Sequence, residues 1–391
     1  QAAIASDGTL RPHAEAIRQA GRWIAVAQES LAGSQPVYDE AAFGFYAPYY
    51  MTEYASGAMP TRLATLRDEL FFDGLARLMM LAGFRLPLVD LERASLLHLR
   101  RHRTLVVFAL DFMARPVQQR LAAYVRGGGR LVVYPTVPIT NERLEPEPLL
   151  AHALGVRHIR QIRSDVVMVG RQEVFTEHLQ AHLDVPGAVV VARTPSGQPC
   201  GVLKRIGRGR ALVIGFGMVH RFDYQVKVVR QLLARLGLHP MLDVSPWDVP
   251  VMIRTGPRGL FVFVCNPHEE PRHLQVRARV GRRSLRIPSR GRFWMPGRSC
   301  RMLPCELSLA PAIQLVSSTC ELTGVQRAGP RALVVRLGIS AGEQAWLQWR
   351  LPASSSVEVQ GAQARQRRRG RRLDLELVGH QDAASLVFRT S

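Results

Sequence analysis

The sequence predicts a doubly wound α/β domain with a mainly parallel sheet, followed by an antiparallel β-sandwich. In residues 117–135, an amphipathic helix with Val117, Leu121 and Val125 on one face leads through three glycines into the apolar run Leu131–Tyr134. Helix and strand patterns of this kind alternate up to residue 245, which requires crossover connections and hence parallel strands. From residue 246 onward only short alternating runs with turn residues between them follow, as in a sandwich.

The first predicted element is an amphipathic helix over residues 11–31, which Gly33 stops. Its single apolar stripe indicates either the last helix of an upstream domain or a docking helix. The parallel strands of the α/β domain are predicted at 41–46, 84–89, 104–110, 130–134 and 211–215. Helices are predicted from the N-cap Thr61 to residue 81, over 117–126 and over 222–236. Gly127, Gly128 and Gly129 end the middle helix, because glycine adopts a left-handed C-cap without steric cost.

Three segments between residues 155 and 206 are separated by Pro-Gly and Ser-Gly turns and predict an antiparallel extension of the sheet, at 166–169, 188–192 and 201–206. The strands of the sandwich are predicted at 249–254, 259–266, 274–280, 331–337, 344–351, 356–359, 373–377 and 385–389. Residues 288–311 are rich in proline and arginine and are interpreted as a long connection.

The formal net charge of +21 suggests a nucleic-acid-binding protein, because clustered cations release counterions from phosphate. However, only Lys204 and Lys227 of the 52 basic residues are lysines, and the arginines are spread over the whole chain. This composition indicates a GC-rich coding bias, and we expect no nucleic-acid partner. The dense cluster from Arg365 to Arg372 lies between two strand-like runs and is interpreted as a solvated charged hairpin or loop or, alternatively, as an anion-binding patch.

The five cysteines, at 200, 265, 300, 305 and 320, have irregular spacing, so we expect reduced, packed thiols and a cytoplasmic location. No run of eighteen apolar residues occurs, which predicts no membrane-spanning helix. The chain starts at Gln1 without a methionine or a signal-peptide pattern, so we expect a processed product or a fragment.

Catalytic and cofactor motifs are missing where an α/β sheet would carry them. The strand at 130–134 runs into Pro135 and Thr136 instead of a nucleophile on a tight turn. The glycines near residues 207–217 do not follow the strand, glycine loop and helix order that a dinucleotide requires. His268 at a strand end has no partners that would make a metal site. We therefore predict no catalytic residue, no cofactor and no metal in this chain.

Two aromatic loops follow parallel strands and are the candidate interface or ligand sites. The first carries Tyr49, Tyr50, Glu53 and Tyr54, and the second carries His220, Arg221, Asp223 and Tyr224. These side chains suit a sugar ring or a protein interface, but they could equally cap the sheet edge by packing. Glu53 and Asp223 could also be imagined as a glycosidase pair, although nothing in the sequence sets their separation.

The segments LRPHAEAIRQAGRWI, FGFYAPYYMTEY, VQQRLAAYVRGGGRLVVYP, ALVIGFG with HRFDYQ, and GLFVFVCNPHEEPRHLQV together resemble the C-terminal part of bacterial β-galactosidases of glycoside hydrolase families 42 and 35. The resemblance implies a flavodoxin-like, class I amidotransferase-like trimerisation domain over residues 34–245 and a β-sandwich over 246–391. Residues 1–33 would end an upstream TIM barrel, which carries the family's two catalytic glutamates and its cysteine-bound zinc.

The resulting prediction is a non-catalytic part of a β-galactosidase-like glycoside hydrolase, which helps subunits associate and walls active sites. The resemblance implies a homo-oligomer, a trimer in this family, with carbohydrate bound by the intact protein, which would hydrolyse terminal β-D-galactosides. The alternatives are an accessory carbohydrate-binding protein that uses the aromatic loops and the sandwich, and an arginine-rich nucleic-acid binder.

Overall fold

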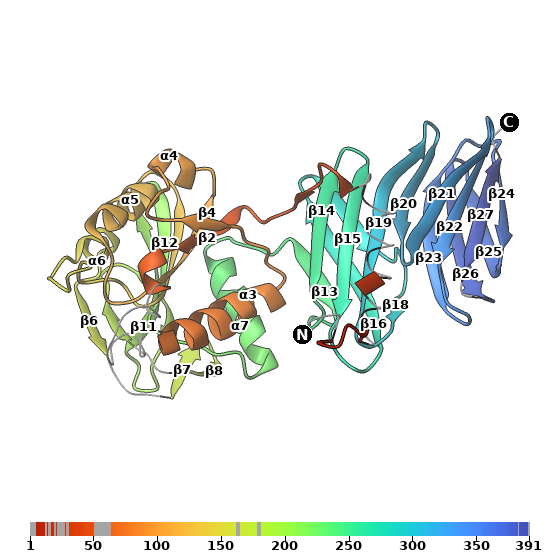
Figure 1. Cartoon of the computed structure of the whole chain (residues 1–391). Coiled ribbons are helices and arrows are strands. Elements are labelled where there is room, and N and C mark those ends of the chain that lie inside the picture. The colour runs from red at the N-terminus through yellow and green to blue at the C-terminus, as the bar shows by residue number, and fades with distance from the viewer. Residues whose placement is uncertain are drawn as a thin grey trace. The chain divides into compact units, whose positions relative to one another are not determined.

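The computed structural model describes residues 5–11, 14, 17–18, 21, 28, 31–50, 64–161, 165–177, 181–381 and 383–389. The chain divides into two compact units, Tyr38–Met241 and a second unit that combines Gln1–Val37 with Leu242–Ser391 (Figure 1). Most of the predicted helix over 11–31 and the predicted N-cap Thr61 lie outside the described residues.

A nine-stranded sheet forms the centre of the unit Tyr38–Met241, in the order β3-β2-β4-β5-β12-β11-β10-β7-β8. The five strands from β3 to β12 pair in parallel, and the other pairs are antiparallel. The parallel strands are β2 (Ala41–Phe45), β3 (Leu88–Asp90), β4 (Thr104–Ala109), β5 (Arg130–Pro135) and β12 (Gly209–Ile214). All six residues of β4 are buried, as expected for a strand covered on both faces.

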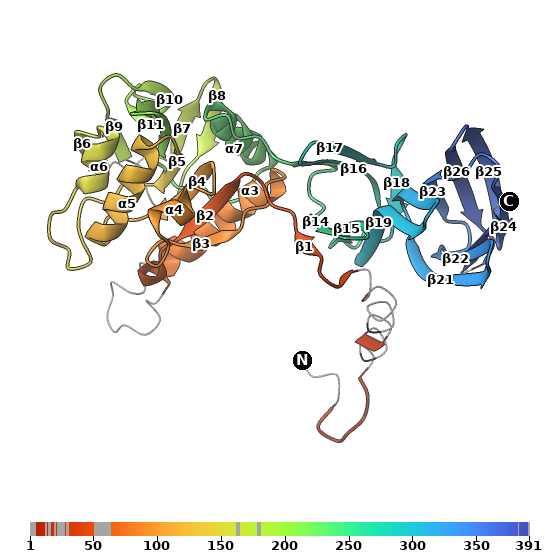
Figure 2. The ribbon, with the colours of Figure 1, turned by 90° about the horizontal axis from the view of Figure 1, so that it is seen from above.

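Helices cover both faces of this sheet. Figure 2 shows α5 and α6 on one side and α3 and α7 on the other. The helical elements are η1 (Ala47–Tyr49), the π-helix η3 (Arg67–Ala76), α3 (Arg77–Leu81), α4 (Leu96–Leu99), α5 (Arg115–Arg126), α6 (Leu149–Leu154) and α7 (Asp223–Arg235). The sequence pattern predicted the helices that contain α3, α5 and α7, but not the short α4 and α6.

The antiparallel extension consists of β7 (Val166–Val169), β8 (Gln172–Phe175), β10 (Val189–Arg193) and β11 (Pro199–Ile206). A separate antiparallel pair is formed by β6 (His158–Gln161) and β9 (Ala181–Asp184). Three of the four extension strands lie where the turn signals predicted them, and β8 is additional.

Two local predictions need correction. The predicted strand 84–89 is only the short β3, and Arg85 before it donates its backbone N–H to the Asp39 carboxylate at 2.6 Å. Gly127 is not left-handed, since its φ is −75°, and the positive φ of 118° belongs to Gly128. Gly129 is required by packing, because a Cβ there would lie 2.3 Å from the Tyr124 ring.

The second unit contains an antiparallel eight-stranded sheet in the order β1-β14-β15-β19-β20-β23-β26-β25. Its strands are β1 (Gln35–Pro36), β14 (Val251–Gly256), β15 (Gly259–Asn266), β19 (Ser299–Ala310), β20 (Ile313–Ser318), β23 (Gln344–Arg350), β25 (Ala362–Arg369) and β26 (Arg372–Gly379). One four-stranded sheet contains β13 (Leu242–Ser245), β16 (Arg272–Val280), β17 (Arg283–Ile287) and β18 (Phe293–Met295). Another contains β21 (Glu321–Gly329), β22 (Ala332–Gly338), β24 (Ser356–Gln360) and β27 (Ala384–Arg389).

A hydrophobic core joins the eight-stranded sheet to the sheet of β21, β22, β24 and β27. Alternate residues of β23 and β26 point into it, and Trp349 packs on Phe388 from β27 with their ring centroids 4.6 Å apart. The two layers therefore bury one face each, as the alternating pattern predicted.

Two predictions for this unit are wrong. Residues 288–311 are not a long connection, because they include β18 and the central strand β19. Cys265 and Cys300 are not reduced thiols but form a disulfide, since they lie directly opposite each other on β15 and β19. The Arg365–Arg372 cluster forms a hairpin, one of the two arrangements expected for it, because Arg365 to Arg369 lie in β25 and Arg372 starts the antiparallel partner β26. Cys200, Cys305 and Cys320 are free and buried, as expected. In the part of the chain that the structure describes, no helix is long and apolar enough to cross a membrane.

Candidate functional site

The carboxyl ends of β2, β4, β5 and β12 meet at one edge of the parallel sheet, where open α/β sheets bind ligands. Both aromatic loops singled out in the sequence start there, the first after β2 and the second after β12. The structure therefore brings the described members of the two loops to the same edge.

Tyr49 in the first loop is fully buried, and its hydroxyl is used within the protein. The hydroxyl donates to the carbonyl of Phe112 and accepts the backbone N–H of Leu110 at 3.1 Å. Tyr46 acts in the same way, since its hydroxyl accepts the N–H of Ala114 at 3.0 Å. Burial raises the pKa of Tyr49 well above its usual value. Both tyrosines hold the loop that follows β4.

Tyr50 lies next to these rings and has a different environment. It stacks on Phe45 with ring centroids 4.4 Å apart, and the Arg67 guanidinium lies 5.9 Å from its centroid. Burial raises the pKa of Tyr50, and the charge of Arg67 opposes that shift. The other two candidates of this loop, Glu53 and Tyr54, lie outside the described residues.

Tyr134, at the end of β5, occupies the position where a hydrolase of this architecture would carry its nucleophile. Its buried hydroxyl accepts the N–H of Met218 at 2.7 Å and donates to the Met218 carbonyl at 3.1 Å. A cis peptide bond joins it to Pro135. The hydroxyl thus connects β5 to the loop after β12, and the position is closed by a structural side chain.

The second loop is fixed against the π-helix η3. The N–H of His220 donates to the Asp73 carbonyl at 2.9 Å, and a Cβ on Gly74 would lie 2.1 Å from the Met218 carbonyl oxygen. Burial lowers the pKa of His220, the charge of Arg77 lowers it further, and Asp223 opposes both.

Arg221 and Glu177 form a two-point ion pair at the rim of this edge. The Arg221 guanidinium lies 2.6 Å and 2.8 Å from the two carboxylate oxygens of Glu177. The Gln225 side chain accepts the N–H groups of Arg221 and Phe222, which fixes the start of α7.

Next to that ion pair, three aromatic rings form a partly exposed group, which we call the aromatic patch: Phe175, Phe222 and Tyr224. The Phe222 centroid lies 5.7 Å from each of the other two rings, and Tyr224 stacks on Phe222 at an interplanar angle of 13°. Phe175 is 50% exposed and Phe222 is 46% exposed. The Tyr224 hydroxyl accepts the N–H of Phe175 at 3.2 Å, which links the start of α7 to the end of β8.

The sequence reasoning missed Phe175 and Glu177 as members of this edge, and it placed Phe222 in the second loop without naming it as a site residue. Phe222 adjoins two predicted site residues, and its exposure could not be read from the pattern. Phe175 and Glu177 come from the region of β8, far from the loop in sequence, and no local signal marks them. Tyr134 carried a signal, namely a tyrosine before proline at the end of a buried strand.

Chemically, this edge can make aromatic contacts and ionic hydrogen bonds. Among the described residues no group of three or more His, Cys, Asp or Glu side chains could hold a metal. Burial raises the pKa values of the Cys200, Cys305 and Cys320 thiols to about 12, so none is a ready nucleophile.

Comparisons with known proteins agree with this architecture. The family model described as GLMA-like, second domain, matches residues 54–189. A β-1,2-glucosyltransferase from Ignavibacterium album is 26% identical over 67% of this chain and 39% of its own length. An exo-β-D-glucosaminidase from Pyrococcus horikoshii is 27% identical over 75% of this chain and 38% of its own length. The chain spans less than two fifths of the length of these curated relatives.

Among solved structures, the GH42 β-galactosidase Gan42B from G. stearothermophilus superposes with a TM-score of 0.58. The similarity covers 78% of this chain and 45% of that chain at 16% sequence identity, so it concerns the fold. The chain is thus similar in sequence and in fold to proteins that act on glycosides.

Proposed function

We propose that this chain is the non-catalytic part of a glycoside-acting protein, in which the unit Tyr38–Met241 mediates subunit association and walls a neighbouring active site. The catalytic glutamates would belong to another domain, a TIM barrel. The observation that carries this proposal is Tyr134, whose buried hydroxyl binds Met218 at the position where the sheet would hold a nucleophile.

The order of the parallel strands supports the expected fold subtype. In chain order, the five parallel strands lie as 2-1-3-4-5, which is the flavodoxin-like arrangement. An amidotransferase-like domain over residues 34–245, with a β-sandwich after it, fits this order. A domain of this class without its nucleophile is suited to serve as a scaffold.

For the intact protein we propose β-glycosides of the gluco series as substrates. The relatives matched in sequence are named a β-1,2-glucosyltransferase and an exo-β-D-glucosaminidase. Terminal β-D-galactosides, which the resemblance implied, have the weaker support, because the likeness to the β-galactosidase concerns the fold alone.

The proposed partners are other copies of the same protein, as a trimer, and the barrel domain. The aromatic patch offers partly exposed rings next to the Arg221–Glu177 pair, and interface centres are enriched in such aromatic and arginine side chains.

The test is an assay of the purified chain on nitrophenyl β-D-glucosaminide, β-D-glucoside and β-D-galactoside. We expect no nitrophenol release from any of them, and release by the protein encoded when the upstream coding sequence is included. Turnover by the chain that disappears in Glu53→Gln or Glu177→Gln would overturn the scaffold role. Calorimetric binding of neutral sugars by the chain alone would instead favour an accessory sugar-binding protein.

A further inference from the structure

Three arginines stand side by side at one end of the eight-stranded sheet, on three neighbouring strands. Arg372 of β26 lies opposite Arg350 of β23 on one side and opposite Arg369 of β25 on the other. Cross-strand partners point to the same face of a sheet. We call these three residues the arginine row, and all three are exposed.

Among the described residues, one carboxylate, that of Asp374, contacts the arginine row. The next arginines along β25 each lie opposite a carboxylate of β26. Arg365 lies opposite Glu376, and Arg367 lies opposite Asp374. In the row itself, Asp374 reaches Arg372 at 3.0 Å and must be shared with Arg367. Like charges directly opposite each other destabilise a sheet, so this end of the sheet favours an external anion.

The row continues across the sheet as hydrogen-bond donors. Arg350 lies opposite Gln314 and donates to its side-chain oxygen at 3.1 Å, and Gln314 lies opposite Ser308. The five strands from β25 to β19 place these side chains over about 19 Å, at roughly 4.8 Å per strand. A ligand that uses the whole row is therefore a chain and not a single small ion.

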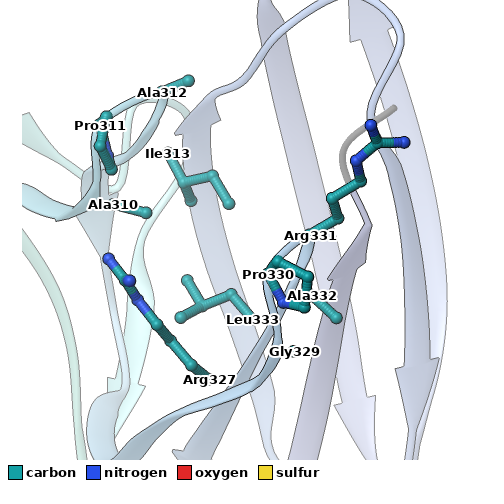
Figure 3. Close-up of a pocket in the computed structure, with 10 residues that line it drawn as sticks. All are labelled: Ala310, Pro311, Ala312, Ile313, Arg327, Gly329, Pro330, Arg331, Ala332 and Leu333. Atoms are coloured by element: carbon teal, nitrogen blue, oxygen red, sulfur yellow. The ribbon is translucent and has the colours of Figure 1, made fainter.

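Two recesses share the turn at Pro311 and Ala312 in their walls, and only the first of them also contains residues of this row. The first, with a volume of about 340 Å³, contains Ser308, Gln314, Arg350 and Arg371. The second, with a volume of about 300 Å³, has Ile313 and Leu333 in its wall (Figure 3). Both volumes are at the lower end of the range for ligand pockets.

Figure 3 shows the Arg327 side chain directed across the second recess toward the turn at Ala310 and Pro311, while Arg331 is directed away from it. None of the described residues that line the two recesses carries a carboxylate. In the first recess the N–H of Leu351 donates to the Arg371 carbonyl at 2.7 Å, which fixes the turn that carries Arg371.

The lining also distinguishes between classes of polyanion. Among the described residues that line the two recesses none is aromatic, so these residues offer no surface on which nucleic-acid bases would stack. Aliphatic walls beside guanidinium groups suit the C–H faces of sugar rings that carry carboxylate or sulfate groups.

We propose that the arginine row and its two recesses bind an anionic polysaccharide, with Arg350, Arg369 and Arg371 holding its acidic groups. That these arginines bind an anionic chain is inferred from the geometry alone. That the chain is a glycan and not another polyanion rests on the proposed carbohydrate role. Binding is measured on the full chain without any catalytic readout, so a failure here leaves the proposed function untouched.

The experiment is fluorescence anisotropy with labelled oligogalacturonate, a sulfated oligosaccharide and a neutral oligosaccharide of matched length. Arg350→Ala combined with Arg369→Ala should weaken binding of an acidic probe about tenfold or more, because charge-assisted hydrogen bonds are lost. Lysine at both positions should give an intermediate affinity, because it keeps the charge but not the two-point geometry. The two acidic probes decide whether carboxylate or sulfate is the preferred group.

The matched control is Arg365→Ala combined with Arg367→Ala, which removes the same charge from the same end of the unit but leaves the arginine row intact. If both double variants weakened binding of the acidic probes equally, the binding would reflect general electrostatic attraction to the positively charged surface, and the proposal would be overturned. Binding of the neutral probe as tight as that of the acidic probes would also overturn it. The proposal would also be overturned if single-stranded DNA of equal charge bound as tightly as the acidic probes and were weakened equally by the Arg350→Ala and Arg369→Ala combination.

Discussion

Asp39 shows how a single half-buried carboxylate organises the unit Tyr38–Met241 at the point where the chain enters and leaves it. One of its oxygens accepts the N–H of Arg85 at 2.6 Å, and the other accepts the N–H of Met241 at 2.8 Å. Two acceptor oxygens are needed, and aspartate is the shortest side chain that provides them. Burial raises the pKa of Asp39 to about 6, although both N–H groups and Arg85 oppose that shift.

This shift predicts a pH dependence of stability. The pKa of Asp39 is about 6 in the folded chain and about 3.9 when unfolded, so the folded state binds the proton more tightly between these values. The contribution of Asp39 to the free energy of unfolding is then largest below pH 4 and falls by about 3 kcal/mol as pH rises to 6 and above. Urea unfolding of the wild type and Asp39→Asn at pH 4, 5, 6 and 7 measures it.

In Asp39→Asn this part of the pH dependence should be lost. The control is Glu173→Gln, which removes an exposed carboxylate of β8 and should leave the slope unchanged. Identical slopes in the wild type and in Asp39→Asn would show that the carboxyl group titrates normally.

At the scale of elements, strand register decides what the sequence pattern leaves open. The β15–β19 register places Cys265 opposite Cys300, 35 residues apart in sequence, and the disulfide joins the two strands. The expectation of reduced thiols failed because cysteine spacing contains no information on register. The strand β19 was also missed, because its prolines and arginines resemble those of a connecting segment although it is a central strand of the sheet.

Reduction of this disulfide should destabilise the unit that contains it. Closing a loop of this length in the unfolded chain corresponds to about 3–4 kcal/mol of stability. We expect Cys265→Ser combined with Cys300→Ser to lower the unfolding free energy by that order, and a reductant to lower the wild type to the same level. The double variant itself should not respond to the reductant. If the wild type is equally stable with and without the reductant, the two thiols are not bonded in solution.

At the scale of the whole molecule, the chain carries two surfaces of opposite character. The aromatic patch on the unit Tyr38–Met241 is apolar with one ion pair at its rim, and the arginine row on the other unit is strongly cationic. The net charge of +21 opposes association through the cationic surface and leaves the aromatic patch as the better candidate for contacts between copies.

Association through the aromatic patch makes a specific prediction. Phe175→Ala combined with Phe222→Ala should weaken self-association about tenfold or more, since truncating aromatic anchors at an interface centre is costly. Light scattering over a range of protein concentrations measures the mass. Leu97→Ala serves as the control, because Leu97 is 73% exposed on α4, outside the patch. A strictly monomeric wild type, or equal association in both variants, contradicts the prediction.

The sequence alone was sufficient for elements whose burial pattern is local. Three elements were predicted within one or two residues: β5 from its apolar run, α5 from its four-residue period and β15 from its alternation. This is possible because backbone periodicity determines which side chains can share a face. The absence of a nucleophile after β5 was also visible, since proline and threonine follow Tyr134 directly.

Only the tertiary structure decided which distant residues meet. Gln35 and Pro36 pair with Thr255 and Arg254, Glu177 meets Arg221, and Arg350, Arg372 and Arg369 form one row. The physical reason is that strand register and loop closure depend on the total burial and hydrogen bonding of the whole sheet. A local sequence pattern specifies the faces of each element, but not the partner to which each face is joined.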